Sequence, residues 1–93
     1  MILVVDSGST KTDWISLDNN GKIIFSTQTR GMNPQVLSSS IISERIINNF
    51  DLYHNRNSVS KIFFYGAGCG VSSSVNRILK VFQTIFKNSE FDI

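Results

Sequence analysis

Cysteine, proline and histidine are each represented by one residue in this 93-residue sequence. The single cysteine, Cys69, excludes an internal disulfide and does not by itself form a structural zinc site, so we expect a reducing, cytoplasmic location. The nine basic residues form no run, and the net charge is only +2. Such scattered charge gives no electrostatic footprint for nucleic acid or for an anionic membrane, and we expect neither as a partner.

Long apolar runs are also missing. The apolar opening at residues 2–5 stops at Asp6 and lacks the basic flank of a secretion signal. No stretch approaches the roughly 20 apolar residues that a membrane span needs. Hydrophobic residues make up 41% of the chain and charged residues 17%, which is typical of a globular protein. We therefore expect one small domain over residues 1–93.

Three β-strands are expected in the first third of the chain. Residues 2–5 form a β-branched, apolar run that is typical of a central strand buried on both faces. Residues 13–18 alternate between two faces, and residues 22–29 form a third strand. The Asn20-Gly21 pair favours a tight hairpin turn before this third strand, so the three strands form an antiparallel meander.

The rest of the chain alternates helices and strands. Apolar residues recur at three- and four-residue spacing from about residue 40 to 50 and again over residues 75–86, which predicts two helices. Ser72, Ser73 or Ser74 can cap the second helix. The other segments are a loop at 54–58, a buried strand at 61–65 and a strand just beginning at 91–93. The order βββαβα(β) predicts an α/β fold with a mixed sheet, its first three strands antiparallel and the helices packed on it.

The clearest chemical pattern is Asp6-x-Gly8-x-Thr10-x-Thr12. Positive φ at Gly8 would turn successive N–H groups inward as an anion nest. Asp6, at the end of the first strand, is a candidate Mg²⁺ ligand, directly or through water. An ordinary hairpin loop has the same composition, so both interpretations stay open on this segment alone. The predicted phosphate-binding residues are Gly8, Ser9, Thr10, Lys11 and Thr12.

Two further loops carry candidate ligand contacts. In the turn 66–70, Gly66 and Gly68 let the backbone approach a phosphate, although a strand-to-helix turn also needs glycine for its own geometry. In Gly31-x-Asn33-Pro34, Asn33 offers a donor and an acceptor that suit a sugar hydroxyl or amide, although Asn-Pro is also an ordinary turn.

Three single residues have simpler interpretations. Cys69 is expected to be a small buried filler rather than a reactive thiol. His54 lies in a polar segment and is expected to be solvated. For Trp14, next to the phosphate pattern, packing and ligand contact both stay open.

Three segments together resemble a known family: Asp6-Ser-Gly-Ser-Thr-Lys-Thr-Asp-Trp14, Gly31-x-Asn33-Pro34 and Phe63-Phe-Tyr-Gly-Ala-Gly-Cys69. They are similar to the N-acetylglucosamine kinase-like proteins, which group with the BadF/BadG/BcrA/BcrD-type ATPases in the actin, hexokinase and heat-shock-chaperone superfamily. The resemblance implies a ribonuclease-H-like N-terminal lobe with ATP and Mg²⁺ in a cleft against a second lobe. It also implies that Asp6 positions Mg²⁺, that residues 8–12 contact the phosphates, and that Gly31 and Asn33 touch the sugar.

One part of the family pattern has no match. In the hexosamine kinases that this chain resembles, a carboxylate soon after the fourth strand acts as the catalytic base. Residues 66–89 contain no Asp or Glu, so no catalytic residue is assigned. The leading hypothesis is an ATP-dependent kinase of an amino sugar such as N-acetylglucosamine. The alternatives are a BadF-type ATPase that activates a dehydratase and a non-catalytic nucleotide-binding relative. A ribonuclease-H-type nuclease ranks last because it needs further carboxylates near the fourth strand.

The short final strand leads to an expectation about partners. A strand of about three residues leaves an open sheet edge that another chain can pair with. We therefore expect residues 1–93 to be an N-terminal lobe that is truncated before its end and is inactive as an isolated kinase. We also expect this piece to associate with itself as a homo-oligomer or with the missing C-terminal lobe.

Overall fold

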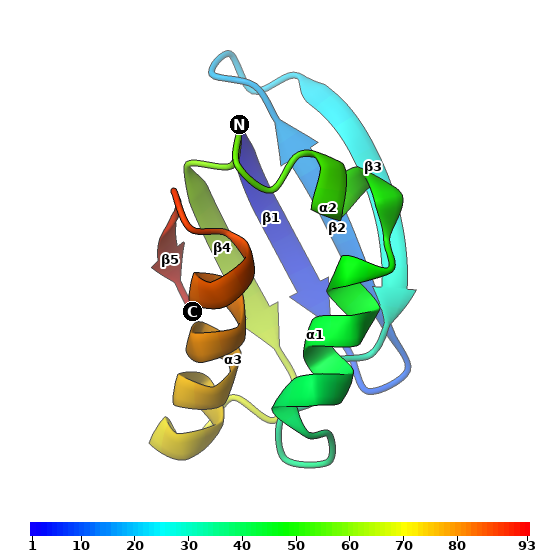
Figure 1. Cartoon of the computed structure of the whole chain (residues 1–93), viewed down its shortest axis with the longest axis vertical. Helices are drawn as coiled ribbons and strands as arrows, with labels where there is room; N and C mark the ends of the chain where they lie inside the picture. Colours follow the sequence, from blue (N-terminus) through cyan, green and yellow to red (C-terminus); the bar gives the residue numbers. More distant parts are fainter.

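The computed structural model describes residues 1–93 as one five-stranded sheet with helices on one side (Figure 1). The strands lie in the order β3-β2-β1-β4-β5 across the sheet. The elements are β1 (Ile2–Ser7), β2 (Lys11–Leu17), β3 (Ile23–Arg30), α1 (Ser39–Ile47), α2 (Phe50–His54), β4 (Lys61–Gly66), α3 (Ser72–Ile85) and β5 (Glu90–Asp92).

The strand directions confirm the expected α/β architecture. β1, β2 and β3 are antiparallel neighbours, whereas β4 runs parallel to β1 and β5 runs parallel to β4. The hairpin turn that the sequence predicted at Asn20-Gly21, between β2 and β3, is present, with Gly21 at a φ of +81°. Asp18 holds this turn, because its Oδ1 accepts from the N–H groups of Asn20 and Lys22.

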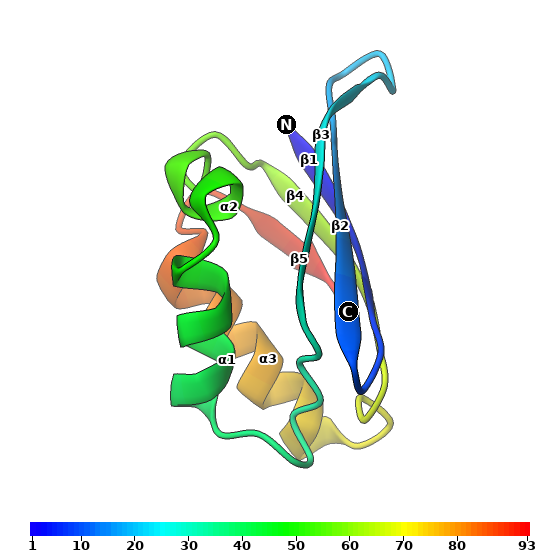
Figure 2. The same cartoon turned by 90° about the vertical axis from the view of Figure 1, so that its right-hand side faces the viewer.

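The core lies between the sheet and the helices (Figure 2). Alternate residues of β1 and β2 face the helices, and this set comprises Leu3, Val5, Ser7, Thr12, Trp14 and Ser16. Helix α3 contributes one buried stripe with the predicted period. Phe82 is at the centre of the aromatic packing, with ring centroids 5.4 Å from Phe64, 5.9 Å from Phe86 and 6.1 Å from Trp14. Phe82 and Phe86 are therefore packing residues.

Two details of the helices differ from the sequence prediction. The helix expected up to residue 50 ends at Ile47, and Asn49 takes an extended conformation whose side chain accepts from Leu52 N–H. This N-cap starts α2, a short helix that the sequence did not predict and that ends at His54, the first residue of the expected loop. The serine cap predicted for α3 was wrong: the chain is extended at Val71, so Ser72 to Ser74 already have helical conformation and Val71 holds the cap position without a side-chain bond.

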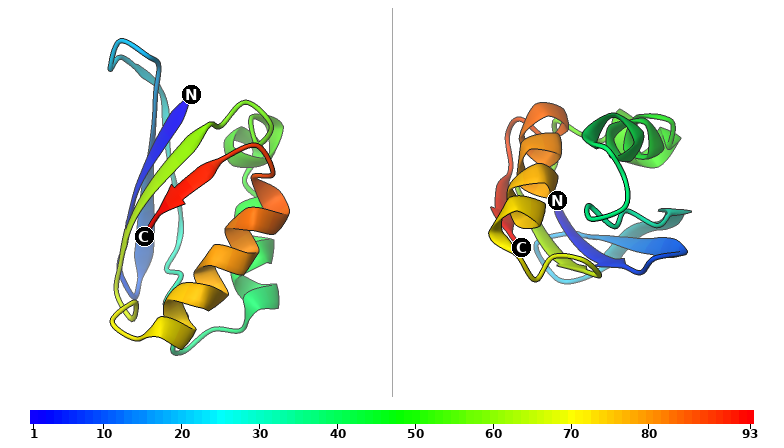
Figure 3. Two further views of the ribbon diagram at one scale, coloured as in Figure 1. Left: turned by 90° about the vertical axis from the view of Figure 1, so that its left-hand side faces the viewer. Right: turned by 90° about the horizontal axis from the view of Figure 1, so that it is seen from below.

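The opposite face of the sheet is covered by no helix (Figures 2 and 3). It nevertheless carries apolar side chains, because Val4 lies between Ile15 on β2 and Phe63 on β4. Val4 and Phe63 are half-buried and Ile15 is 37% exposed. The strand that the sequence predicted to be buried on both faces is therefore fully buried on one face only. None of the helices has the length and apolarity of a membrane span.

Removal of the Phe82 ring should cost more stability than removal of any exposed aromatic ring. Phe82→Ala leaves a cavity among four aromatic rings, and we expect a loss of about 3–5 kcal/mol in the free energy of unfolding. Urea unfolding followed by circular dichroism measures this. Phe50→Ala is the matched control, because Phe50 is 75% exposed and its loss should change stability by less than about 0.5 kcal/mol. Equal losses for the two variants would contradict the described core.

Candidate functional site

Three loops meet at one end of the sheet, the lower end in Figure 1. They are the β1–β2 hairpin at 8–10, the segment 31–38 after β3 and the turn 67–71 after β4. All three follow the carboxyl ends of strands that run in the same direction, and ligands of open α/β sheets bind at such ends. We refer to this place as the loop end of the sheet. The structure thus brings the three predicted site segments together.

Backbone hydrogen bonds tie these loops to one another. Gly31 N–H donates to Thr10 O at 3.0 Å, and Ala67 N–H donates to Ser7 O at 2.9 Å. Gly31 is buried against the hairpin, because a Cβ at this position would lie 2.7 Å from Gly8 O and closer still to Ser9 O. Only glycine allows this approach of the two backbones.

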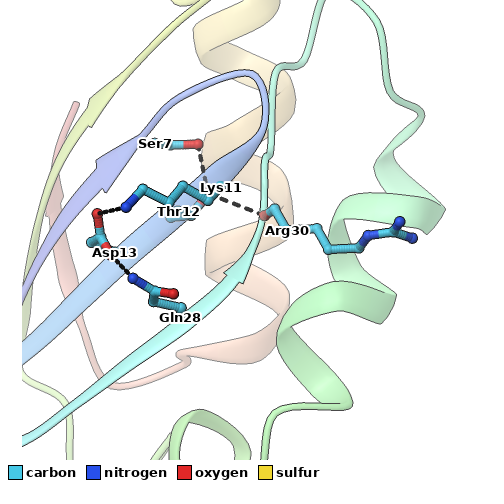
Figure 4. Close-up of polar contacts among 6 residues, drawn as sticks. All are labelled: Ser7, Lys11, Thr12, Asp13, Gln28 and Arg30. Carbon is cyan, nitrogen blue, oxygen red and sulfur yellow. Dashed lines mark hydrogen bonds and ion pairs between the residues drawn. The ribbon is translucent and has the colours of Figure 1, made fainter.

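A buried pair of hydroxyl groups supports the same junction (Figure 4). Ser7 Oγ and Thr12 Oγ1 lie 2.8 Å apart across the base of the hairpin. Thr12 Oγ1 donates to Arg30 O at 3.2 Å, and Ser7 Oγ accepts from Met32 N–H at 3.3 Å. Both side chains are buried, so the Thr12 hydroxyl bonds within the fold rather than facing the surface of the loop. Ser7 was missed at the sequence level, although its place after Leu3 and Val5 on the buried face gave a signal.

The tip of the hairpin presents unused donors. The backbone N–H groups of Ser9 and Thr10 make no hydrogen bond within the chain, and neither do the hydroxyls of these two residues. The positive φ predicted for Gly8 was wrong, because only Gly21 and Gly68 have positive φ. Gly8 N–H instead donates to Lys11 O at 2.8 Å, which closes the loop without a left-handed residue. The free donors therefore come from the two residues after Gly8.

Asp6 is exposed near the end of β1, on the sheet face that has no helix. Its register neighbours are Asp13 on β2 and Tyr65 on β4. Asp13 is already engaged, since its Oδ1 accepts from Gln28 Nε2 at 2.6 Å and its Oδ2 lies 3.9 Å from Lys11 Nζ (Figure 4). The Asp6 carboxylate has no hydrogen-bond or ionic partner in the chain. One free carboxylate near a loop with unused N–H groups is the kind of ligand that Mg²⁺ takes when it keeps several waters and binds an anion as well.

Asn33 lies where the second loop meets the third. Its Oδ1 accepts from Gln35 N–H at 2.9 Å, which is the turn geometry that the Asn-Pro pair also predicted. Its Nδ2 makes no hydrogen bond and is available to a ligand. Gly68 has a φ of +79°, and a Cβ there would collide with the Asn33 side-chain amide. Gly68 thus allows the turn after β4 to contact Asn33.

The helices hold the second loop in place through two arginines that the sequence reasoning missed. The Arg45 guanidinium on α1 donates to Gly31 O, and the Arg77 guanidinium on α3 donates to Pro34 O. Their positions on the polar sides of two amphipathic helices gave no signal of this role, because exposed arginines are common there.

The turn after β4 is the third source of free donors. The N–H groups of Gly68, Cys69 and Gly70 make no hydrogen bond within the chain. Gly66 is required by packing, because a Cβ there would overlap the ring of Phe64. Cys69 is half-buried against the core, and burial raises the pKa of its thiol. This agrees with a filler role and disfavours a reactive thiolate.

Trp14 and His54 lie away from any ligand-accessible position in the loops. Trp14 is fully buried, and its Nε1 donates to Thr29 Oγ1 at 3.0 Å, so the residue packs. His54 is exposed on α2 and stacks on Phe50, with ring centroids 5.1 Å apart.

The comparisons with known proteins agree with this architecture. No family model and no curated protein matches the chain. Among solved structures, the chain is similar to a crystal structure from Porphyromonas gingivalis described as "Putative N-acetylglucosamine Kinase", with a TM-score of 0.84 and 29% sequence identity. This match confirms the resemblance to the N-acetylglucosamine kinase-like proteins. The match covers 98% of this chain and 32% of that protein, so the chain spans about a third of its length.

Alanine at Gly31 tests the junction of the loops. Gly31→Ala forces the hairpin away from the second loop, and we expect a loss of about 1–3 kcal/mol in the free energy of unfolding together with weaker phosphate binding at the hairpin. Urea unfolding and calorimetry with ATP measure the two effects. Gly70→Ala is the control, because a Cβ at Gly70 meets no atom within 4 Å. If both variants behave alike, the close approach at Gly31 is unimportant.

The thiol of Cys69 gives a pH-dependent test. A raised pKa means a smaller thiolate fraction at pH 7–8 than in an exposed cysteine, so alkylation by iodoacetamide should be slow at pH 7. The rate should keep rising above pH of about 8.5, the ordinary thiol pKa. Mass spectrometry follows the reaction at one residue, because the chain has a single cysteine. The urea-unfolded chain is the control and should react as an exposed thiol does; a folded chain that reacts faster would refute the filler role.

Proposed function

We propose that this chain is the phosphate-binding part of an ATP-dependent kinase that phosphorylates an amino sugar of the N-acetylglucosamine type. The observation that carries the proposal is the junction of the three loops, where unused N–H groups of the hairpin and of the turn after β4 lie at the same end of the sheet as the free Asp6 carboxylate. The similarity to a solved structure described as a kinase of this sugar supports the same conclusion.

Each loop has a chemical task in this proposal. Ser9 and Thr10 supply backbone and hydroxyl donors to the β- and γ-phosphates, and the Lys11 ammonium balances their charge. Gly68 brings further free N–H groups near the same anion. The Asn33 amide, through its free Nδ2, donates to the sugar, and Gly31 holds this loop against the hairpin.

Asp6 would hold the metal of Mg-ATP, directly or through water. Mg²⁺ bound to the β- and γ-phosphates neutralises charge that develops during phosphoryl transfer. The Asp6 carboxylate positions that charge at the end of β1, beside the hairpin donors. A second lobe would exclude water and hold the sugar against the γ-phosphate.

A non-catalytic nucleotide-binding role is the second candidate. None of the three loops contains an aspartate or glutamate, so no carboxylate among them can take the proton of a sugar hydroxyl. Binding of Mg-ATP needs only the hairpin, the turn after β4 and Asp6. Measured transfer of phosphate to N-acetylglucosamine by a protein that contains this lobe distinguishes the kinase from this alternative.

Asp6→Asn tests the proposed metal position. Calorimetry should show Mg-ATP binding to the variant about tenfold more weakly than to the native chain, because a charge-assisted interaction is lost. Metal-free ATP should bind no worse, since the lost carboxylate repels phosphate. Asp92→Asn is the matched control, because Asp92 is an exposed carboxylate on β5 and away from the hairpin. Equal weakening with and without Mg²⁺, or no weakening at all, would refute the assignment.

A further inference from the structure

A polar groove of about 710 Å³ lies between strand β3 and helix α1. We call it the α1 groove. β2 and the end of β3 form one wall, and the polar side of α1 with the two residues after it forms the other. The lining residues are Thr10, Lys11, Gln28, Thr29, Arg30, Ile41, Glu44, Arg45, Asn48 and Asn49. Its volume lies within the range of about 300–1,000 Å³ that is usual for small-molecule sites.

Hydrogen bonds between the sheet and the helices fix the two ends of the α1 groove. At one end the Arg45 guanidinium donates to Gly31 O. At the other end Asn49 Nδ2 donates to Thr27 Oγ1 at 3.0 Å, while the Asn49 Oδ1 caps α2. These hydrogen bonds hold the two walls at a fixed separation, so the α1 groove is part of the folded structure.

Positive charge dominates the α1 groove. The side chains of Arg30 and Arg45 face it, whereas Glu44 is the only carboxylate in its lining. Lys11 also contributes to the lining, but its Nζ lies 3.9 Å from Asp13 Oδ2 (Figure 4). Arg30 makes no hydrogen bond or ion pair through its side chain, which extends from the end of β3 toward α1 (Figure 4). Arg45 uses one N–H for Gly31 O, and a guanidinium has five, so most of its donors remain free. Two guanidinium groups on opposite walls are suited to a planar or tetrahedral oxyanion.

The remaining lining distinguishes between kinds of anion. Ile41 is the only apolar side chain, which disfavours a lipid or a fatty acid. No aromatic residue lines the α1 groove, so a nucleobase would find no stacking surface. The Asn48 amide makes no hydrogen bond through its side chain and provides a donor and an acceptor for hydroxyl groups.

We propose that the α1 groove binds a sugar phosphate, at a site separate from the tip of the β1–β2 hairpin. Arg30 and Arg45 bind the phosphate, and Asn48 binds a sugar hydroxyl. This goes beyond the proposed kinase function, because the ligand lies between β3 and α1 rather than between the three loops. Binding there would act on Gly31 through Arg45, and so would reach the junction of the loops.

The test uses the 93-residue chain labelled with ¹⁵N and titrated with glucose 6-phosphate in 0.15 M salt. Amide signals of Arg30, Glu44 and Asn48 should shift, and glucose itself should leave them unchanged. Arg30→Gln should weaken the binding about tenfold, because one charge-assisted contact is lost. Arg30 has no structural bond, so this variant should unfold at the same urea concentration as the native chain.

Arg56→Gln is the matched control, since it removes the same charge from a residue outside the α1 groove. It should bind glucose 6-phosphate as the native chain does. Equal weakening by the two substitutions, or shifts confined to residues 8–12 and 66–70, would overturn the proposal. Inorganic phosphate that binds as tightly as glucose 6-phosphate would overturn the assignment to a sugar phosphate. The hairpin and its proposed Mg-ATP binding are tested separately by Asp6→Asn, so failure of one proposal leaves the other intact.

Discussion

The buried hydrogen bond between the hydroxyls of Ser7 and Thr12 is the interaction on which the candidate site depends. It joins the end of β1 to the start of β2, and its two oxygens also bind the backbone of the segment that leaves β3. All the polar atoms in this group find partners within the chain. Two small hydroxyl residues thereby replace apolar packing at the one place in the core where three strand ends must be held at defined positions.

This arrangement separates atoms that build the site from atoms that face a ligand. Ser7, Thr12 and Gly31 are buried and serve the junction, whereas Ser9, Thr10 and Asp6 are exposed and their side chains make no hydrogen bond. A ligand at the hairpin would therefore meet donors whose positions are fixed by buried partners. Such preorganisation lowers the cost of ordering the loop when an anion binds.

The sequence predicted the order of elements apart from α2, the antiparallel meander and the fold class, because the alternation in β2 and the helical period of α3 are strong local signals. It also identified the three loops, from the Asp-x-Gly-x-Thr-x-Thr pattern, the Gly-x-Asn-Pro segment and the glycine-rich turn after β4. It failed where a local pattern had two solutions. Three consecutive serines predicted a cap that the extended backbone at Val71 supplies instead, and Gly8 was assigned a positive φ that the loop does not need.

Other features needed the three-dimensional arrangement. The contact of Gly31 with Ser9 joins residues 22 positions apart, and the bond from Arg77 to Pro34 joins residues 43 apart. The α1 groove is likewise made of two segments whose separate compositions are ordinary. No periodicity or motif in a single segment contains such information, because the residues act through a neighbour that is distant in the sequence.

The uncovered sheet face gives the chain a temperature-dependent surface. Val4, Ile15 and Phe63 form a stripe that remains partly hydrated, and the attraction between hydrated apolar groups weakens on cooling and strengthens on moderate warming. The stripe therefore favours contact with other apolar surfaces most at warm temperatures. At low temperature, hydration of the stripe competes most strongly with such contacts. We therefore expect the solubility of this chain to depend on temperature through this face of its sheet, whereas the loops at the end of the sheet are held by polar contacts.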